Sequence, residues 1–314
     1  MEKINQLTIK SPEESILNFW NKISRNDKIA FASGFLFCLI VHFFAYTNTL
    51  FIHDSIQLLN ESDGLQNGRF FINLLMPLVS RITIPWVIGI ITSTFLGFCN
   101  LFLTKTINIS KPLYIIITGS LLASFPVMAA NHIYFSSVYI YVFAMLTATL
   151  CVYFSDKNVI LSGICLIISL SSYQAYLCFA VTLFLVKMLA DMMEEKIKGK
   201  QVILKGLKYI SIIIASTIIY YVLWKGIMFI FDVDVIKYRG YNTFEQTLFE
   251  NLLSKLFTTI ICSLTISCGQ TFTLSLPFKI IYTLINILSL VFAFLNIPKK
   301  TKNRKFAILI FLFF

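Results

Sequence analysis

The chain has 314 residues, of which 57% are hydrophobic and only 13% are charged. Soluble domains carry about 25% charged residues, so this composition excludes an ordinary soluble domain. Apolar runs of about 20 residues, the length that crosses the hydrocarbon core of a bilayer, recur along the sequence. The sequence therefore predicts an all-α fold, a polytopic membrane helix bundle.

The formal net charge of +11 is accounted for by membrane topology. With the N-terminus placed in the cytoplasm, 19 of the 26 basic residues fall on the cytoplasmic side, as the positive-inside rule requires. The excess of basic residues therefore does not require a nucleic-acid partner, and none is predicted. It indicates instead an affinity for anionic membrane lipid.

In chain order, residues 1–28 are expected to form a cytoplasmic N-terminal segment with an amphipathic surface helix from Pro12 to Lys22. Residues 29–314 then form a transmembrane catalytic domain. The final apolar run, 306–314, is too short to cross a bilayer, which predicts that the chain is truncated at its C-terminus. About eight spans are predicted, at 29–51, 84–104, 112–130, 134–154, 158–171, 173–191, 206–231 and 277–296.

The polar stretch 244–273 is expected to be an interfacial or re-entrant helix on the outer side. A full crossing there would place the basic cluster 299–305 outside, against the charge rule. A turn at Ser267 to Gln270 would fit this arrangement. The seven cysteines form no C-x-x-C pair, so neither a disulfide framework nor a metal site is expected, and no cofactor is required.

Four outer features converge in this topology: the acidic loop 52–69, the connection 130–133, the turn 171–174 and the loop 232–241. Carboxylates beside a bilayer are costly, so an acidic loop between two apolar spans marks a candidate active site. Cytoplasmic loops are short or plainly basic, and we see no internal repeat of the kind on which many transporters are built.

Two short motifs carry a resemblance to a known family. Asn67-Gly68-Arg69-Phe70 opens an amphipathic stretch, and Tyr173-Gln174 stands at the start of a span. In these features the chain resembles the GtrII-type glucosyltransferases, bacterial inner-membrane enzymes of the GT-C class. The resemblance covers most of 29–191. In the family's usual acidic pair, this chain has His53-Asp54, so one of the two acids is missing or displaced.

The resemblance implies a GT-C-like fold and a hexosyltransferase with a periplasmic active site. Such an enzyme moves glucose from undecaprenyl-phosphate glucose to lipid-linked O-antigen, a modification of lipopolysaccharide that often underlies phage-driven serotype conversion. The implied partners are a donor-synthesising enzyme and a flippase that turns the donor over.

Sugar transfer to a hydroxyl needs a base at the attacking oxygen and a group that stabilises the departing phosphate. Asp54 is our candidate base, with a solvated loop acid or helix cap as the alternative. Arg69 is the leading phosphate ligand, because a guanidinium binds phosphate bidentately; an anchor for lipid headgroups is the alternative. The further candidates for substrate binding are Glu61, Asp63, Arg81, His132, Tyr173, Gln174, Lys225 and Arg239.

Two other classes compete with a transferase. A transporter or lipid flippase predicts ionisable groups near the middle of the membrane, whereas here they gather at the outer mouth. A noncatalytic scaffold for glycan assembly predicts that Asp54 is dispensable.

Overall fold

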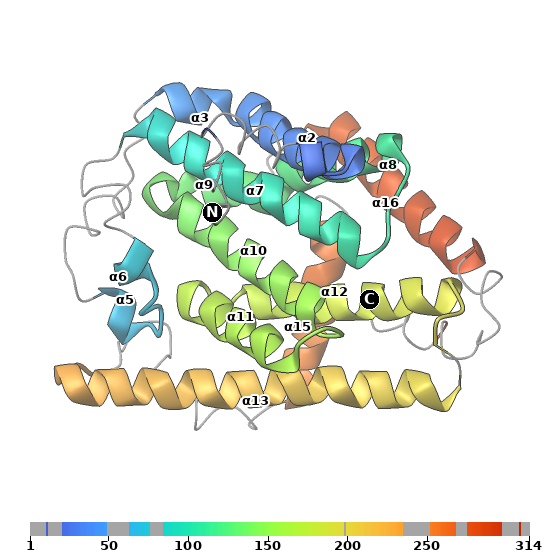
Figure 1. Cartoon of the computed structure of the whole chain (residues 1–314). Helices are drawn as coiled ribbons and strands as arrows, with labels where there is room; N and C mark the ends of the chain where they lie inside the picture. Colours follow the sequence, from blue (N-terminus) through green and yellow to red (C-terminus); the bar gives the residue numbers. More distant parts are fainter. Residues whose placement is uncertain are drawn as a thin grey trace, which may run out of the picture.

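The computed structural model describes residues 11, 21–48, 63–75, 84–197, 199–234, 252–267, 275–296 and 308. Within these residues the regular structure is helical, and the helices pack into a bundle (Figure 1). Each of the eight predicted spans coincides with helical structure. Among the described helices five are long and apolar enough to cross a membrane, or six if one bent pair is counted as a span. The predicted all-α membrane bundle is therefore confirmed, and the number of spans remains approximate.

The helix ends follow from local sequence. Ser24 caps α2 (Arg25–Val41) by accepting a hydrogen bond from the Asp27 amide at 3.1 Å. Asn158 caps α11 (Val159–Ser172) in the same way. Proline opens three helices, where its missing N–H costs nothing. These are α7 (Pro85–Thr106), α8 (Pro112–Ser124) and α9 (Pro126–Ile133).

Proline also bends the third predicted span. Phe125, which precedes Pro126, is extended with φ −61° and ψ 137° because a residue before proline is pushed out of the helical region. As a result α8 and α9 meet at 40°. The first predicted span is likewise interrupted, at His42, between α2 and α3 (Phe43–Thr47).

The core is built around α10 (Val138–Phe154), which follows the short η2 (Phe135–Ser137) and has 13 buried side chains among its 17 residues. It packs on α7, α11 and α12 (Tyr176–Met193), while α2 packs on α7 and α8. The α2–α7 approach is very close, since a Cβ at Gly34 would lie 2.8 Å from the Leu96 carbonyl oxygen. Small residues allow this backbone approach in membrane bundles.

Three further helices bury a smaller share of their residues than α10 does. The 32-residue α13 (Lys200–Phe231) packs on α11 and runs along one side of the bundle (Figure 1). The 16-residue α15 (Leu252–Ser267) is shorter than the helices that could cross a membrane, and the interfacial or re-entrant helix expected at 244–273 stays a prediction. The expected turn beyond Ser267 and nearly all of the helix expected at 12–22 lie outside the described residues. The third of these helices, α16 (Leu276–Asn296), has no buried residue.

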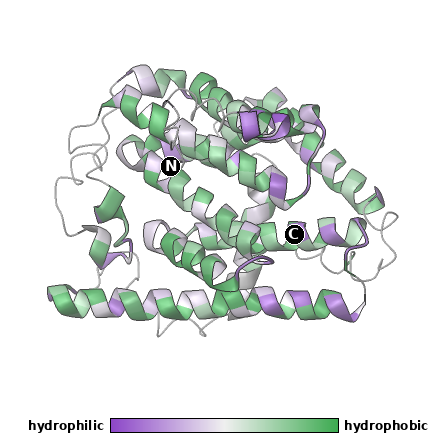
Figure 2. Cartoon of the chain, viewed as in Figure 1, coloured by the Kyte–Doolittle hydropathy of each residue, from purple (hydrophilic) through white to green (hydrophobic). Residues whose placement is uncertain are grey.

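The bundle has two chemically different ends. We call the end that carries residues 63–75, 131–137 and 171–175 the loop end. The opposite end, where α12 finishes and α13 begins, we call the lysine end. Hydrophilic residues colour the first turns of α13 and the start of α2 there, while the helices between are mainly hydrophobic (Figure 2).

An ion-pair network holds the lysine end together. Asp191 on α12 is 3% exposed, and its carboxylate lies 2.6 Å from Lys205 Nζ and 3.6 Å from Lys187 Nζ. The same two lysines lie 2.8 and 3.1 Å from Asp156, between α10 and α11. Burial alone would raise the pKa of Asp156, but the hydrogen bond from Lys205 and the two lysine charges hold that pKa below its usual range.

Removing the buried carboxylate of this network is expected to destabilise the protein strongly. Asp191→Ala leaves Lys187 and Lys205 with only Asp156, and breaking a buried pair costs about 3–5 kcal/mol. Glu194→Ala is the matched control, because Glu194 ends the same helix and pairs with the exposed Lys196. A surface pair is worth about 0–1 kcal/mol. Thermal unfolding in detergent measures both variants, and equal Tm values for the two would contradict the structural role of Asp191.

Candidate active site at the loop end

The Asn67-Gly68-Arg69-Phe70 motif forms the end of a short helix. After α5 (Asp63–Gln66), the Gly68 amide donates to the Leu65 carbonyl at 3.1 Å and the Arg69 amide donates to the Gly64 carbonyl at 2.7 Å. This is the paired pattern of a Schellman cap, with Gly68 at the left-handed position (φ 74°). The cap reverses the chain, which then enters α6 (Ile72–Leu75).

Side chains from other helices bind the carbonyls of this cap. Trp224 Nε1 donates to the Leu65 oxygen at 2.8 Å, and Tyr220 Oη donates to the Gly68 oxygen at 3.0 Å. Gln174 Nε2 donates to the Asn67 oxygen at 2.6 Å. Two of these donors lie on α13 and the third lies in the turn between α11 and α12. The two motifs that carried the family resemblance are therefore in direct contact.

Arg69 is partly buried against the same turn. Its Nε donates to Gln174 Oε1 at 3.4 Å, and its guanidinium carbon lies 4.7 Å from the centroid of the Tyr173 ring. The Tyr173 ring is itself packed on Tyr141, with centroids 4.4 Å apart. None of the ion pairs among the described side chains involves Arg69. Among the described residues, the groups that orient this planar cation are therefore neutral.

The turn itself is fixed by backbone and core contacts. The Phe71 amide donates to the Ser171 carbonyl at 3.0 Å, which joins the cap to the end of α11. Asn131 Nδ2 donates to Tyr176 Oη at 2.9 Å, which joins α9 to the start of α12. Parts of three of the four features expected to converge thus meet at the loop end, the first of them being described only from residue 63 onward. The fourth, 232–241, is described only as far as residue 234.

His132 is part of the protein core. The sequence placed it in a connection, whereas the structure places it in the last turn of α9 with a side chain only 6% exposed. Its Nδ1 lies 2.7 Å from the Met128 carbonyl oxygen, and its Nε2 lies 2.7 Å from Tyr46 Oη. Its ring stacks on His42 with centroids 3.5 Å apart. Both ring nitrogens have partners within the protein, and a part for His132 in substrate binding stays a prediction.

The other candidates differ in how far the structure describes them. Lys225 is exposed on α13, with Nζ 5.5 and 5.8 Å from the rings of Tyr221 and Trp224. For Asp63 the structure describes the backbone, at the start of α5, and not the side chain. The candidates that lie outside the described residues are Asp54, Glu61, Arg81 and Arg239.

Sequence reasoning missed the aromatic residues that build this site, namely Tyr141, Tyr176, Tyr220 and Trp224. In a chain with 15% aromatic residues their presence carries little information. One local signal existed for two of them. Tyr220 and Trp224 stand four residues apart and therefore share one face of α13. That face points at the cap.

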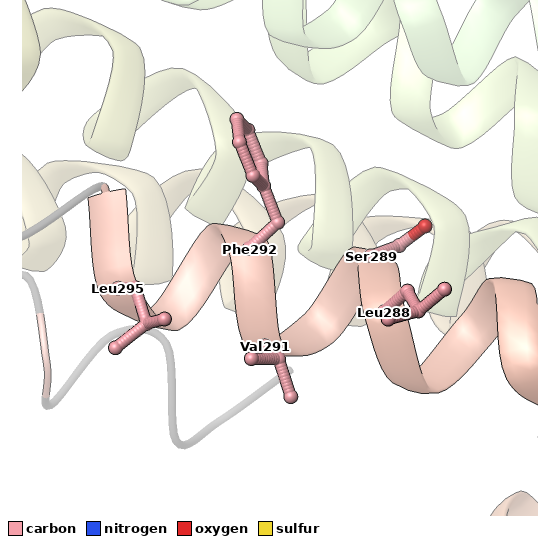
Figure 3. A pocket seen from close by; sticks show the side chains of 5 residues that line it. All are labelled: Leu288, Ser289, Val291, Phe292 and Leu295. Carbon is pink, nitrogen blue, oxygen red and sulfur yellow. The ribbon is translucent and has the colours of Figure 1, made fainter.

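A second concave feature has no such chemistry. A pocket on α16 is lined by Leu288, Ser289, Val291, Phe292 and Leu295, all from one helix (Figure 3). Among the described lining residues the only polar side chain is a serine hydroxyl, and none is ionisable. These residues therefore offer neither a base nor a cation for group transfer.

The fold and the site together define an all-α membrane protein with a polar cluster at one end of its helix bundle. A family model described as glucosyl transferase GtrII matches residues 43–314, so the chain belongs to that family and is a glycosyltransferase. The resemblance seen in the sequence is thereby confirmed. No curated protein and no solved structure matches the chain.

A side chain at Gly68 should disrupt the cap. The left-handed conformation costs a non-glycine residue about 1–2 kcal/mol. An added Cβ would also collide with Tyr220 Oη and lie 3.0 Å from Gln174 Nε2. Gly68→Ala is therefore expected to lower the free energy of unfolding by at least about 1–2 kcal/mol.

The control for this variant is Gly226→Ala on α13, where a Cβ would meet nothing within 4 Å. Alanine in a helix is favoured over glycine by about 1 kcal/mol, so this change should be neutral or stabilising. Thermal unfolding of both variants in detergent is the measurement. A Gly68→Ala protein as stable as the wild type would contradict the cap geometry.

Proposed function

We propose that this glycosyltransferase moves glucose from a polyprenyl-phosphate donor to a lipid-linked O-antigen acceptor, and that it does so at the loop end, facing the periplasm. The observation that carries the proposal is the oriented guanidinium of Arg69, which is partly buried and has no carboxylate partner among the described side chains. Such a group suits a phosphate, which accepts two parallel hydrogen bonds from arginine.

The charge distribution supports the orientation. The lysine end carries Lys187, Lys205 and Lys208 and lies opposite the Arg69 site. Basic residues concentrate on the cytoplasmic side of inner-membrane proteins, which supports a periplasmic position for the loop end. We propose the bacterial inner membrane as the location, with a cytoplasmic enzyme that makes the donor lipid and a flippase that delivers it.

The reaction assigns a role to each group. The acceptor hydroxyl attacks C1 of the donor glucose, the bond from C1 to the phosphate oxygen breaks, and a base takes the hydroxyl proton. We assign the base to Asp54, with Glu61 and Asp63 as alternatives. Arg69 neutralises the charge that develops on the departing polyprenyl phosphate. Tyr173 and Gln174 orient Arg69 in this scheme.

The test uses the gene in a host with a defined O-antigen and compares lipopolysaccharide sugar composition and linkage. Asp54→Asn is expected to reduce glucose addition by about 10²–10⁴-fold, the range for a lost general base. Arg69→Lys keeps the charge but loses the planar fork, and is expected to cost at least about tenfold. Arg25→Lys, an exposed arginine at the opposite end of the bundle, is the matched control.

Protein levels in the membrane are measured for every variant. Glucose branches that persist in Asp54→Asn would move the base to Glu61 or Asp63. Equal activity in Arg69→Lys and Arg25→Lys would leave Arg69 as a headgroup anchor. No new sugar from the wild type, with donor lipid present, would refute the proposed donor–acceptor pair.

A further inference from the structure

We propose that Tyr220 is a positioning residue for Arg69, and that its hydroxyl sets where the guanidinium meets the phosphate of a polyprenyl lipid. The inference rests on the proposed phosphate-binding role of Arg69. Through Tyr220, helix α13 would therefore take an indirect part in substrate binding.

A closed ring of hydrogen bonds carries the inference. Arg69 Nε donates to Gln174 Oε1 at 3.4 Å, and Gln174 Nε2 donates to Tyr220 Oη at 2.9 Å. Tyr220 Oη then donates to the carbonyl of Gly68 at 3.0 Å, and Gly68 is the residue before Arg69. The ring therefore fixes Arg69 twice, through its side chain and through the backbone that precedes it.

The hydroxyl cannot easily be replaced within this ring. The Tyr220 hydroxyl accepts one hydrogen bond and donates another, while the Gln174 amide also serves the Asn67 carbonyl at 2.6 Å. Tyr220 is 6% exposed and its ring stacks on Phe70, with centroids 6.1 Å apart. Loss of the hydroxyl would leave the Gly68 carbonyl without this donor in a buried site, so the cap would shift to find another.

The same helix offers a matched control. Tyr209 lies three helical turns before Tyr220 on α13, is 2% exposed, and donates its hydroxyl hydrogen to Asp156 at 3.3 Å. Both tyrosines are buried and hydrogen-bonded, but Tyr209 belongs to the lysine end. A general loss of packing or hydrogen bonding on α13 would therefore affect both Tyr→Phe variants.

The experiment measures binding of undecaprenyl phosphate to the purified full chain in detergent, by titrating its thermal stabilisation. The proteins are wild type, Tyr220→Phe, Arg69→Lys, the double variant and Tyr209→Phe. Undecaprenol without phosphate, phosphatidylglycerol and inorganic phosphate are titrated in parallel. These arms separate a polyprenyl phosphate from a membrane headgroup and from a free anion.

Tyr220→Phe is expected to raise the apparent Kd about three- to tenfold, the worth of one buried neutral hydrogen bond. In the Arg69→Lys background the same change should alter Kd by less than about twofold, because the ring is already open. Tyr209→Phe should bind as the wild type does, even if its Tm falls.

Equal effects of Tyr220→Phe in both backgrounds would overturn the proposal, because the residue would then act independently of Arg69. So would wild-type affinity in Tyr220→Phe, or wild-type binding that does not depend on the lipid phosphate. Failure of the proposed function has a different signature. Binding would then depend on the lipid phosphate and show the coupling between Tyr220 and Arg69, while cells that express the wild-type protein added no glucose to lipopolysaccharide.

Discussion

One constraint governs the loop end. Backbone groups that lie outside a helix at a membrane boundary need hydrogen-bond partners. Irregular backbone at membrane depth is tolerated only where it is buried in protein or lines a water-filled cavity. Here the carbonyls of Leu65, Asn67 and Gly68 each accept a hydrogen bond from a side chain of another segment. The donors that satisfy these carbonyls also determine where the next residue, Arg69, is held. The same contacts therefore satisfy the backbone hydrogen bonds and position the Arg69 guanidinium.

The two ends of the bundle use charge in opposite ways. At the lysine end the buried Asp191 carboxylate is matched by two ammonium groups, and the result is a closed, self-compensated network. At the loop end the partners that Arg69 has among the described side chains are an amide oxygen and an aromatic ring, neither of which carries a negative charge. A compensated network serves stability, whereas a charge that is held but not compensated is suited to a ligand of opposite sign.

Much of the architecture could be predicted from the sequence, because the bilayer imposes the length and polarity of each span. All eight predicted spans coincide with helical structure, and the turn at Tyr173-Gln174 lies where it was expected. Helix α9 ends at Ile133, three residues beyond the predicted end of the third span at residue 130. Asn131 and His132 are polar and follow an apolar run, which is typical of a loop, but tertiary partners on α3 and α12 retain them in α9. Such tertiary contacts outweigh the local preference of polar residues for a loop.

The site could be predicted only in part, because its contacts join residues that are far apart in the sequence. Arg69 and Gln174 were recognisable as motif residues, but their contact spans 105 positions and no local pattern reveals it. Tyr220 and Trp224 bond to carbonyls 152 and 159 positions away. In an apolar helix such residues are indistinguishable from the lipid-facing aromatics around them. Hydrogen bonds of this range follow from how the helices pack, and packing is what a single sequence encodes least directly.

The identity of the residue beside Arg69 gives the clearest sign that the cation is kept available. A glutamate at position 174 would orient the guanidinium through the same oxygen position, but it would neutralise its charge and could not donate to the Asn67 carbonyl. Glutamine both orients Arg69 and holds the cap, because its oxygen accepts from Arg69 while its nitrogen donates to Asn67 and Tyr220. The neutral amide therefore holds the cap and the arginine together without itself neutralising the charge of Arg69.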